Sequence, residues 1–201
     1  MDLFDQEPYP NLLPHNGTVK YFGRILNYQK SHFYFNELLN NILWKQDKVI
    51  IRNQEIRTKR KVALYGDKQY HYTYSNTRKQ ALLWTKELIQ LKEIIEKVTR
   101  TTFNSCLLNL YHDGNEGMSW HSDDEAVLGK NTTIASLSLG AERSFSFKHK
   151  KTKETRSLFL ETGSLLLMTG TTQHHWWHCL PKTAKIIEPR VNLTFRTIVE
   201  V

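Results

Sequence analysis

Residues 120–125, with the sequence WHSDDE, place one imidazole and three carboxylates within six positions. Neighbouring carboxylates repel one another, so this segment is expected to face a metal ion, a cationic ligand or a lysine cluster. In an extended chain, side chains two positions apart share a face, so His121 and Asp123 can converge on one point. Together with a distant histidine they would form the facial triad that binds non-haem Fe(II). Alone, the same pattern also fits a polar turn with a hydrogen-bonded histidine.

A second cluster of candidate ligands follows the apolar run SLLLMTG. The sequence TQHHWWHCLP holds three histidines and two tryptophans. If this segment is extended, His174, Trp176 and His178 share one face, so either His174 or His178 could complete the triad. A zinc site and simple aromatic packing are the alternatives. Zinc is the less attractive of the two, because structural zinc prefers thiolates and only Cys179 is near.

A third motif, EPRVNLTFR, alternates polar with apolar residues. On a solvated strand the two guanidiniums of its polar face would need no ligand. Inside a β-core they would aim two bidentate carboxylate binders at one cavity. A dicarboxylate beside an iron triad has an obvious candidate, 2-oxoglutarate. The polar residues are Arg190, Asn192, Thr194 and Arg196, and the apolar residues are Val191, Leu193 and Phe195.

The elements that must position these motifs are mostly short strands. After residue 103, β-rich runs alternate with turns that contain Gly, Asn, Asp or charged residues. Strands of this length and spacing are typical of a sandwich, a barrel or a jelly roll. The expected strands are SCLLNLY, TIASLSLG, RSFSFKHK, TRSLFLE, SLLLMTG and RVNLTFRTIV.

The first half of the chain is expected to hold two helices with strands between them. Apolar spacing predicts one helix that begins at Ser31 as its N-cap, and a second helix over residues 79–100. A basic stretch between them predicts strands or a hairpin, and YHYTYS predicts a half-buried strand. Residues 1–30, which carry three prolines, are expected to be an irregular lead-in. The prediction is one α+β domain, with helices first and then a β-core.

Composition limits the partners. The net charge of +8 and the pI near 9.4 favour a polyanion such as nucleic acid. Two cysteines make a disulfide framework improbable and indicate a reducing, intracellular compartment, the cytoplasm of a prokaryote or the nucleus of a eukaryote. There is no apolar run of transmembrane length and no signal-peptide start, so we expect no membrane partner. Separately, we expect the protein to be a monomer.

Taken together, the motifs HSDDE, IASLSLGAERSFSFKHK, HCLP and PRVNLTFR resemble the AlkB family of Fe(II)/2-oxoglutarate-dependent nucleic-acid dealkylating dioxygenases, most closely its DNA-repair members. The resemblance is specific over residues 103–198, looser over 31–100 and absent over 1–30. It implies a dioxygenase domain at 31–201, with a nucleotide-recognition region at 45–78. Its double-stranded β-helix (jelly-roll) core would occupy residues 103–201.

The resemblance also implies residue roles. His121, Asp123 and His178 would bind Fe(II), because in that family the ligand histidine precedes the last strand by the spacing seen here for His178 and not for His174. Oxidation of 2-oxoglutarate by O2 to succinate and CO2 would drive hydroxylation of an N-alkyl carbon, and the product would release an aldehyde. Arg190 would bind the distal carboxylate of 2-oxoglutarate, and Arg196 would lie near the carboxylate that chelates iron. The whole cosubstrate set is Asn109, Tyr111, Arg190, Asn192, Thr194 and Arg196.

The implied substrate is alkylated DNA, single- or double-stranded, or RNA. Lesions such as 1-methyladenine and 3-methylcytosine are cationic, so Asp124 and Glu125 would favour them over the neutral parent base. The flipped base would stack on Tyr72 or Tyr74, opposite His121. Basic residues of the hairpin would contact phosphates. These include Arg52, at a position where some relatives carry an apolar wedge, and Arg60. The alternatives are an RNA demethylase of the same family and a non-catalytic nucleic-acid-binding module.

Overall fold

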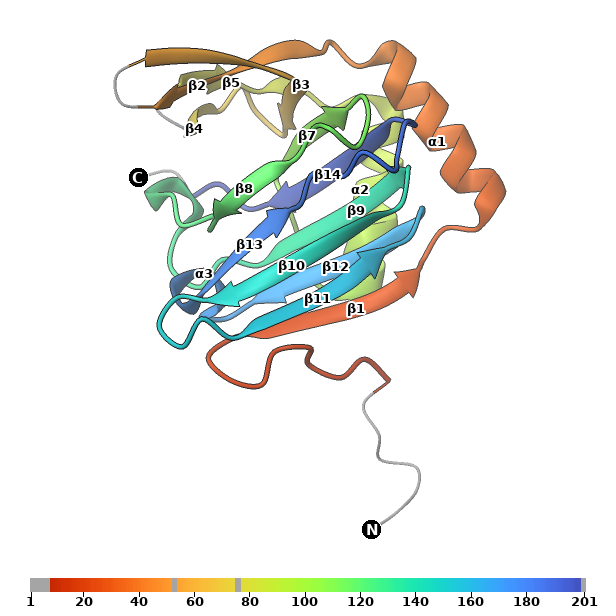
Figure 1. The fold of residues 1–201 in the computed structure, drawn as a ribbon. Helices are drawn as coiled ribbons and strands as arrows, with labels where there is room; N and C mark the ends of the chain where they lie inside the picture. The colour runs from red at the N-terminus through yellow and green to blue at the C-terminus, as the bar shows by residue number, and fades with distance from the viewer. Residues whose placement is uncertain (1–7, 52–53, 75–76, 200–201) are drawn as a thin grey trace.

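The computed structural model describes residues 8–51, 54–74 and 77–199 (Figure 1). Its strands form two stacked sheets, antiparallel except for the short parallel pair of β3 and β6, and one small hairpin. The large sheet has the order β1-β12-β9-β14-β7-β3-β2, with β6 beside β3, and the smaller sheet has the order β11-β10-β13-β8. No helix of the described residues is long and apolar enough to cross a membrane.

The bounds of the elements are as follows. The large sheet contains β1 (Thr18–Arg24), β2 (Lys45–Ile51), β3 (Gln54–Gly66), β6 (Leu82–Leu83), β7 (Ser105–Tyr111), β9 (Ile134–Gly140), β12 (Ser164–Thr169) and β14 (Arg190–Arg196). The four-stranded sheet contains β8 (Met118–His121), β10 (Arg143–His149), β11 (Thr155–Leu160) and β13 (Trp176–Leu180). The hairpin pairs β4 (His71–Tyr74) with β5 (Thr77–Gln80), and the helices are α1 (Tyr28–Asn41), α2 (Lys86–Thr99) and α3 (Thr172–His175).

The large sheet has two chemically different faces. Side chains alternate along a strand, so one face of β14 presents Val191, Leu193 and Phe195 to the main apolar core. That core also contains Leu88 and Leu91 of α2, and Figure 1 shows α2 behind the large sheet, away from the four-stranded sheet. The opposite face of β14 carries the polar residues of the motif and points into the space between the two sheets. The expected alternation is confirmed.

Three expectations about the first hundred residues are wrong. Residues 1–30 are not all irregular, because β1 pairs with the edge of β12 and buries Val19 completely. The first helix begins at Tyr28, not Ser31: Asn27 is the N-cap and accepts a hydrogen bond from the backbone N–H of Lys30 at 2.9 Å. The second helix begins only after Thr85, its N-cap.

Helix α2 begins later than expected because the residues before it form backbone hydrogen bonds with another segment. Lys79 and Gln80 were expected to begin this helix, but the backbone of residues 77–80 pairs with β4, and the N–H of Ala81 donates to the carbonyl of Tyr70. Tertiary pairing therefore overrides the helix propensity of Lys79 and Gln80. The predicted hairpin is confirmed as β2 and β3, which pair from Lys45–Val62 to Ile51–Gln54. Figure 1 shows this hairpin and the β4–β5 hairpin on the same side of the molecule.

The packing of α2 can be tested by substitution. Leu91→Ala should lower the free energy of unfolding by about 2–5 kcal/mol, because the fully buried side chain leaves a cavity in the main core. Ile89→Ala, on the exposed side of the same helix, should change it by less than about 1 kcal/mol. Urea unfolding of both variants gives the comparison, and equal losses would contradict this placement of α2.

Candidate metal and cosubstrate site

Three residues bring possible ligand atoms together between the sheets. His121 ends β8, Asp123 lies two residues later in an irregular segment, and His178 lies in the middle of β13. His121 and His178 are cross-strand partners with ring centroids 4.2 Å apart, and Asp123 Oδ1 lies 3.8 Å from His121 Nε2. The possible ligand atoms of the three residues all lie within 4.8 Å of one another. Only His121 is partly exposed, so the cluster opens on its side.

The donor set fits Fe(II). Two imidazole nitrogens and one carboxylate oxygen are the donors of the non-haem iron triad. Asp123 Oδ1 is buried without a hydrogen-bond partner among the described residues, whereas Oδ2 accepts from Arg196 Nη2 at 2.7 Å. A cation between the two imidazoles and Oδ1 would satisfy that oxygen.

The electrostatics of the cluster suit a metal. Burial, followed by the nearby His121, lowers the pKa of His178 to about 3, so this imidazole is neutral at pH 7, as a ligand must be. Burial would raise the pKa of Asp123, but the nearby Arg196 and, to a lesser degree, the two imidazoles outweigh it and lower that pKa. A neutral imidazole and an ionised carboxylate are the protonation states that bind a cation.

The segment that carries Asp123 is held by residues that the sequence did not reveal. Residues 122–125 form neither helix nor strand. The backbone N–H of Asp123 donates to Gln173 Oε1 at 2.9 Å, and Gln173 is 4% exposed. Lys150 Nζ donates to Ser122 Oγ at 2.9 Å and to the carbonyl of Gln173 at 2.8 Å. Gln173 lies within the TQHHWWH motif, but only the folded chain brings it to Asp123.

His174 takes no part in this cluster. In an extended segment, His174 and His178 would share a face. Instead, residues 172–175 form α3, which ends immediately before β13. His174 is exposed on this helix, whereas His178 is buried in the following strand. The choice of His178 agrees with the geometry, and the reasoning from alternation was wrong.

The polar face of β14 continues from the triad into the same cavity. Register pairs Arg190 with Tyr111 and Asn192 with Asn109 across β14 and β7. The cavity walls also include Leu107, Phe145 and Met168, which are apolar. The expected cosubstrate residues that line the cavity with the triad are Asn109, Tyr111, Arg190, Asn192, Thr194 and Arg196. The fold therefore brings all six expected cosubstrate residues together around one cavity.

Arg190 is the most informative of these residues. It is 2% exposed, donates from Nη2 to Ser138 Oγ at 2.8 Å, and lies over the Tyr111 ring at 5.6 Å. Burial lowers its pKa to about 10, so it remains cationic at pH 7. Within residues 8–51, 54–74 and 77–199, no carboxylate forms an ion pair with it. A buried guanidinium without a counter-charge is costly, so the arrangement calls for an anionic ligand.

Two neighbours of Arg190 have further partners. Arg196 donates to the carboxylate of Asp123, so it fixes the orientation of a ligand residue in addition to lining the cavity. The side-chain amide of Asn192 donates to Ser136 Oγ at 2.8 Å and to the carbonyl of Leu137 at 3.0 Å. Asn192 thus anchors β14 to β9. By contrast, Asn109 Oδ1 is buried without a partner in the described part of the chain.

The expected substrate residues lie in different settings. Asp124 is exposed and lies 3.8 Å from Lys150 Nζ, and Glu125 is half-buried. Arg60 is 4% exposed, pairs with the buried Asp47 and lies over the Tyr111 ring at 5.9 Å, so it is an interior residue and not a surface phosphate contact. Arg52 and the side chains of Tyr72 and Tyr74 lie outside the described residues.

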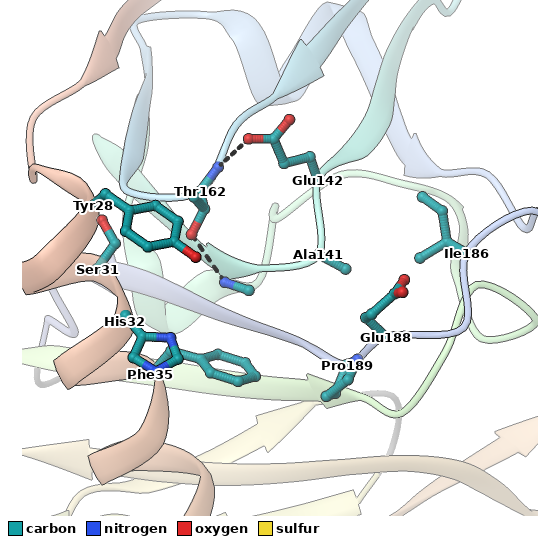
Figure 2. Close-up of a pocket in the computed structure, with 11 residues that line it drawn as sticks. Tyr28, Ser31, His32, Phe35, Ala141, Glu142, Thr162, Ile186, Glu188 and Pro189 are labelled. Atoms are coloured by element: carbon teal, nitrogen blue, oxygen red, sulfur yellow. Dashed lines mark hydrogen bonds between the residues drawn. The ribbon is translucent and has the colours of Figure 1, made fainter.

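A larger cavity, of about 510 Å³, lies elsewhere (Figure 2). Tyr28, His32 and Phe35 of α1 line it, together with Ala141 after β9 and Pro189 before β14. It shares no lining residue with the cavity at the triad. Ligand chemistry, and not cavity size, therefore identifies the site.

Comparisons with known proteins agree with this geometry. Residues 18–196 match the 2OG-Fe(II) oxygenase superfamily. The chain is 40% identical over 174 residues to the alpha-ketoglutarate-dependent dioxygenase alkB homolog 3 of Bos taurus, covering 82% of this chain and 60% of that protein. It is 32% identical over 214 residues to the DNA oxidative demethylase ALKBH2 of Arabidopsis thaliana, covering 92% of this chain and 68% of that protein.

The chain thus spans about three fifths of the length of the Bos taurus relative. A solved structure of OsALKBH1 superimposes with a TM-score of 0.67 at 15% identity, over 94% of this chain and 100% of that one. This likeness, with the two stacked antiparallel sheets, confirms the expected double-stranded β-helix core. The chain belongs to the 2OG-Fe(II) oxygenase superfamily and, within it, to the AlkB family.

Proposed function

We propose that this protein is an Fe(II)- and 2-oxoglutarate-dependent dioxygenase that removes alkyl groups from the bases of DNA. The observation that carries the proposal is the presence, in one cavity, of the His121–Asp123–His178 triad and the buried guanidinium of Arg190, which has no counter-charge among the described residues. A metal triad beside an anion-binding arginine matches the needs of iron and of a dicarboxylate cosubstrate. The names of the relatives, an alpha-ketoglutarate-dependent dioxygenase and a DNA oxidative demethylase, support the reaction and the substrate.

Each residue of the site has a distinct task in this reaction. His121, Asp123 and His178 would hold the iron, which with 2-oxoglutarate and O2 supplies the oxidising chemistry. Arg190 would bind the distal carboxylate of 2-oxoglutarate by paired hydrogen bonds. Arg196 binds Oδ2 of Asp123 and thereby leaves Oδ1 for the metal.

The apolar walls of the cavity exclude water from the reacting atoms. Phe145 stacks on His178 at a centroid distance of 5.6 Å, and Leu107 and Met168 line the same space. A dry cavity strengthens the electrostatic contacts of the bound cosubstrate and limits side reactions. Once the N-alkyl carbon is hydroxylated, the unstable product releases an aldehyde and the repaired base.

The charges around the opening suit a nucleic acid. Arg57, Lys59 and Lys61 are exposed on β3, on the hairpin that the sequence analysis assigned to nucleotide recognition. These cations would contact phosphates, and Asp124 and Glu125 would favour cationic lesions. An enzyme of this kind would act as a monomer where nucleic acid is found, in the cytoplasm of a prokaryote or the nucleus of a eukaryote.

The triad is tested by removing one ligand at a time. His121→Ala, Asp123→Ala and His178→Ala should each lower turnover by more than about 100-fold, since loss of an outer-shell partner alone can cost that much. His174→Ala and His175→Ala are matched controls and should stay near wild type. Succinate formation with Fe(II), 2-oxoglutarate and a methylated oligonucleotide measures turnover. If His174→Ala were as inactive as His178→Ala, the ligand assignment would be wrong.

The role of Arg190 is tested through the cosubstrate. Arg190→Ala should raise the KM for 2-oxoglutarate by about 10- to 100-fold, the range expected for loss of a charged hydrogen bond. Arg190→Lys should recover only part of the loss, because an ammonium lacks the planar fork of a guanidinium. Arg24→Ala, an arginine half-exposed at the molecular surface, is the control. An unchanged KM in Arg190→Ala would contradict the assignment.

The acidic residues after the triad are tested with two kinds of lesion. Asp124→Asn and Glu125→Gln should reduce turnover of 1-methyladenine and 3-methylcytosine more than turnover of neutral 3-methylthymine, because only the cationic bases lose an attraction. Turnover of the same DNA and RNA oligonucleotides carrying each lesion provides the measurement. Equal losses on all lesions would mean that these acids hold the loop, Asp124 through Lys150, and do not select the base.

A further inference from the structure

The outer face of the four-stranded sheet carries two tryptophans, each beneath a lysine. Trp120 of β8 is 41% exposed, and Lys148 Nζ lies 5.5 Å from the centroid of its ring. Trp177 of β13 is half-buried, and Lys153 Nζ lies 5.0 Å from its ring. Both are cation–π contacts on a surface that the reaction at the triad does not use.

The positions of the two tryptophans follow from strand alternation. Trp120 and Trp177 each precede a metal-site histidine, His121 and His178, whose side chains point into the cavity. The tryptophans therefore point outward from the same two strands. Because His121 and His178 are cross-strand partners, the two rings lie on neighbouring strands of one face. Lys148 is opposite Trp177 in the register, and its amine reaches across β13 to Trp120 on β8.

The charge of this face is positive. Residues 148–156 run from the end of β10 through the turn into β11 and have the sequence KHKKTKETR. They hold four lysines against one glutamate; Arg156 is opposite the buried Phe147 in the register and so points to the other face. Lys150 turns toward Ser122 and Gln173, but Lys151 and Lys153 are exposed. The outward positions of the strands themselves hold Ser144, Ser146, Lys148, Thr155, Ser157 and Phe159, with no carboxylate among them. Exposed aromatic rings together with cations favour the binding of a polyanion that carries flat apolar groups.

The face also adjoins the opening of the site. β8 is an edge strand of its sheet, and His121 at its end is the partly exposed member of the triad. Trp120 is its immediate neighbour in the chain. A nucleic-acid strand could therefore place one base in the cavity past His121 while the adjacent nucleotide contacts Trp120. The nucleotides beyond that one would then contact Trp177 and Lys153.

We propose that Trp120, Trp177, Lys148 and Lys153 form a stacking surface for the single-stranded nucleic acid that flanks the target base. Aromatic rings that stack unpaired bases, interleaved with cations that contact phosphates, are the usual means of binding single strands without sequence preference. Paired bases cannot present their faces to these rings, so the surface selects single strands over duplex. The inference rests on the proposed function and extends it to the form of the substrate.

Binding and turnover test the surface separately. Affinity is measured by fluorescence anisotropy with unmodified oligodeoxythymidylates of about 4 and about 16 nucleotides, lengths that span the usual site sizes of single-strand binders. Trp120→Ala together with Trp177→Ala should weaken binding of the longer strand by about tenfold or more, a loss within the range for removed base stacking. Binding of the shorter strand and of a duplex should change far less. Tyr28→Ala, an exposed aromatic on α1, is the control.

The lysines give a second measurement that does not depend on the tryptophans. Lys148→Gln and Lys153→Gln should each reduce the salt dependence of binding by about one phosphate contact, whereas Lys30→Gln on α1 should not. Wild-type affinity of the double tryptophan variant, or equal losses on single strand and duplex, would overturn the inference. So would polyglutamate that competes as well as the oligonucleotide, because the face would then bind acidic peptides.

Turnover separates this inference from the proposed function. If wild type forms no succinate with any methylated oligonucleotide, the proposed function fails, whatever the binding experiment gives. If wild type is active, the double tryptophan variant should lose kcat/KM on the longer methylated strand and keep it on the shorter one. Equal loss on both lengths would mean that the tryptophans support the neighbouring histidines, and the stacking surface would be rejected.

Discussion

The ion pair between Arg196 and Asp123 joins the two sheets at the point where the chemistry is placed. Arg196 belongs to the large sheet, and Asp123 follows β8 of the smaller one. Both side chains are buried, so removal of either partner would leave an uncompensated charge in the interior. The pair also uses only one carboxylate oxygen, which leaves the other directed at the two imidazoles. The geometry of the metal site therefore depends on how the sheets are stacked.

This dependence explains the acidic segment WHSDDE. The fold brings Arg196 to Asp123 and Lys150 to Asp124, the second pair at the longer distance of 3.8 Å. Lys150 comes from the turn between β10 and β11, and Arg196 comes from β14, far away in the chain. The repulsion between neighbouring carboxylates is thus offset by residues from two other segments. An exposed acid such as Asp124 retains only a weak, solvent-screened contact, which leaves it able to respond to a ligand.

Much of the site was predictable because strand alternation is a strong local rule. The polar and apolar faces of RVNLTFR follow directly from it. Asn109 and Tyr111, two positions apart in SCLLNLY, share a face for the same reason, although their role was implied only by the resemblance. The sequence alone did not choose between His174 and His178; the resemblance to a family did. Gln173 was missed because its role requires contact with Asp123, fifty residues earlier in the chain. Strand β1 was missed because its pairing partner, β12, lies far along the sequence, and the late start of α2 reflects backbone pairing that no local propensity encodes.

The pairing of β1 with β12 has a consequence for the order in which the molecule can assemble. Thr18 donates to Thr172, and the separation of these residues is 154 positions. During synthesis the first strand leaves the ribosome long before its partner exists, and Asp123 emerges well ahead of Arg196. Contacts this distant in sequence slow folding and leave strand edges open in the meantime. The nascent chain therefore cannot complete the large sheet or its metal site until β14 has been made. If the polypeptide were released early, the edge of β1 would be exposed to aggregation.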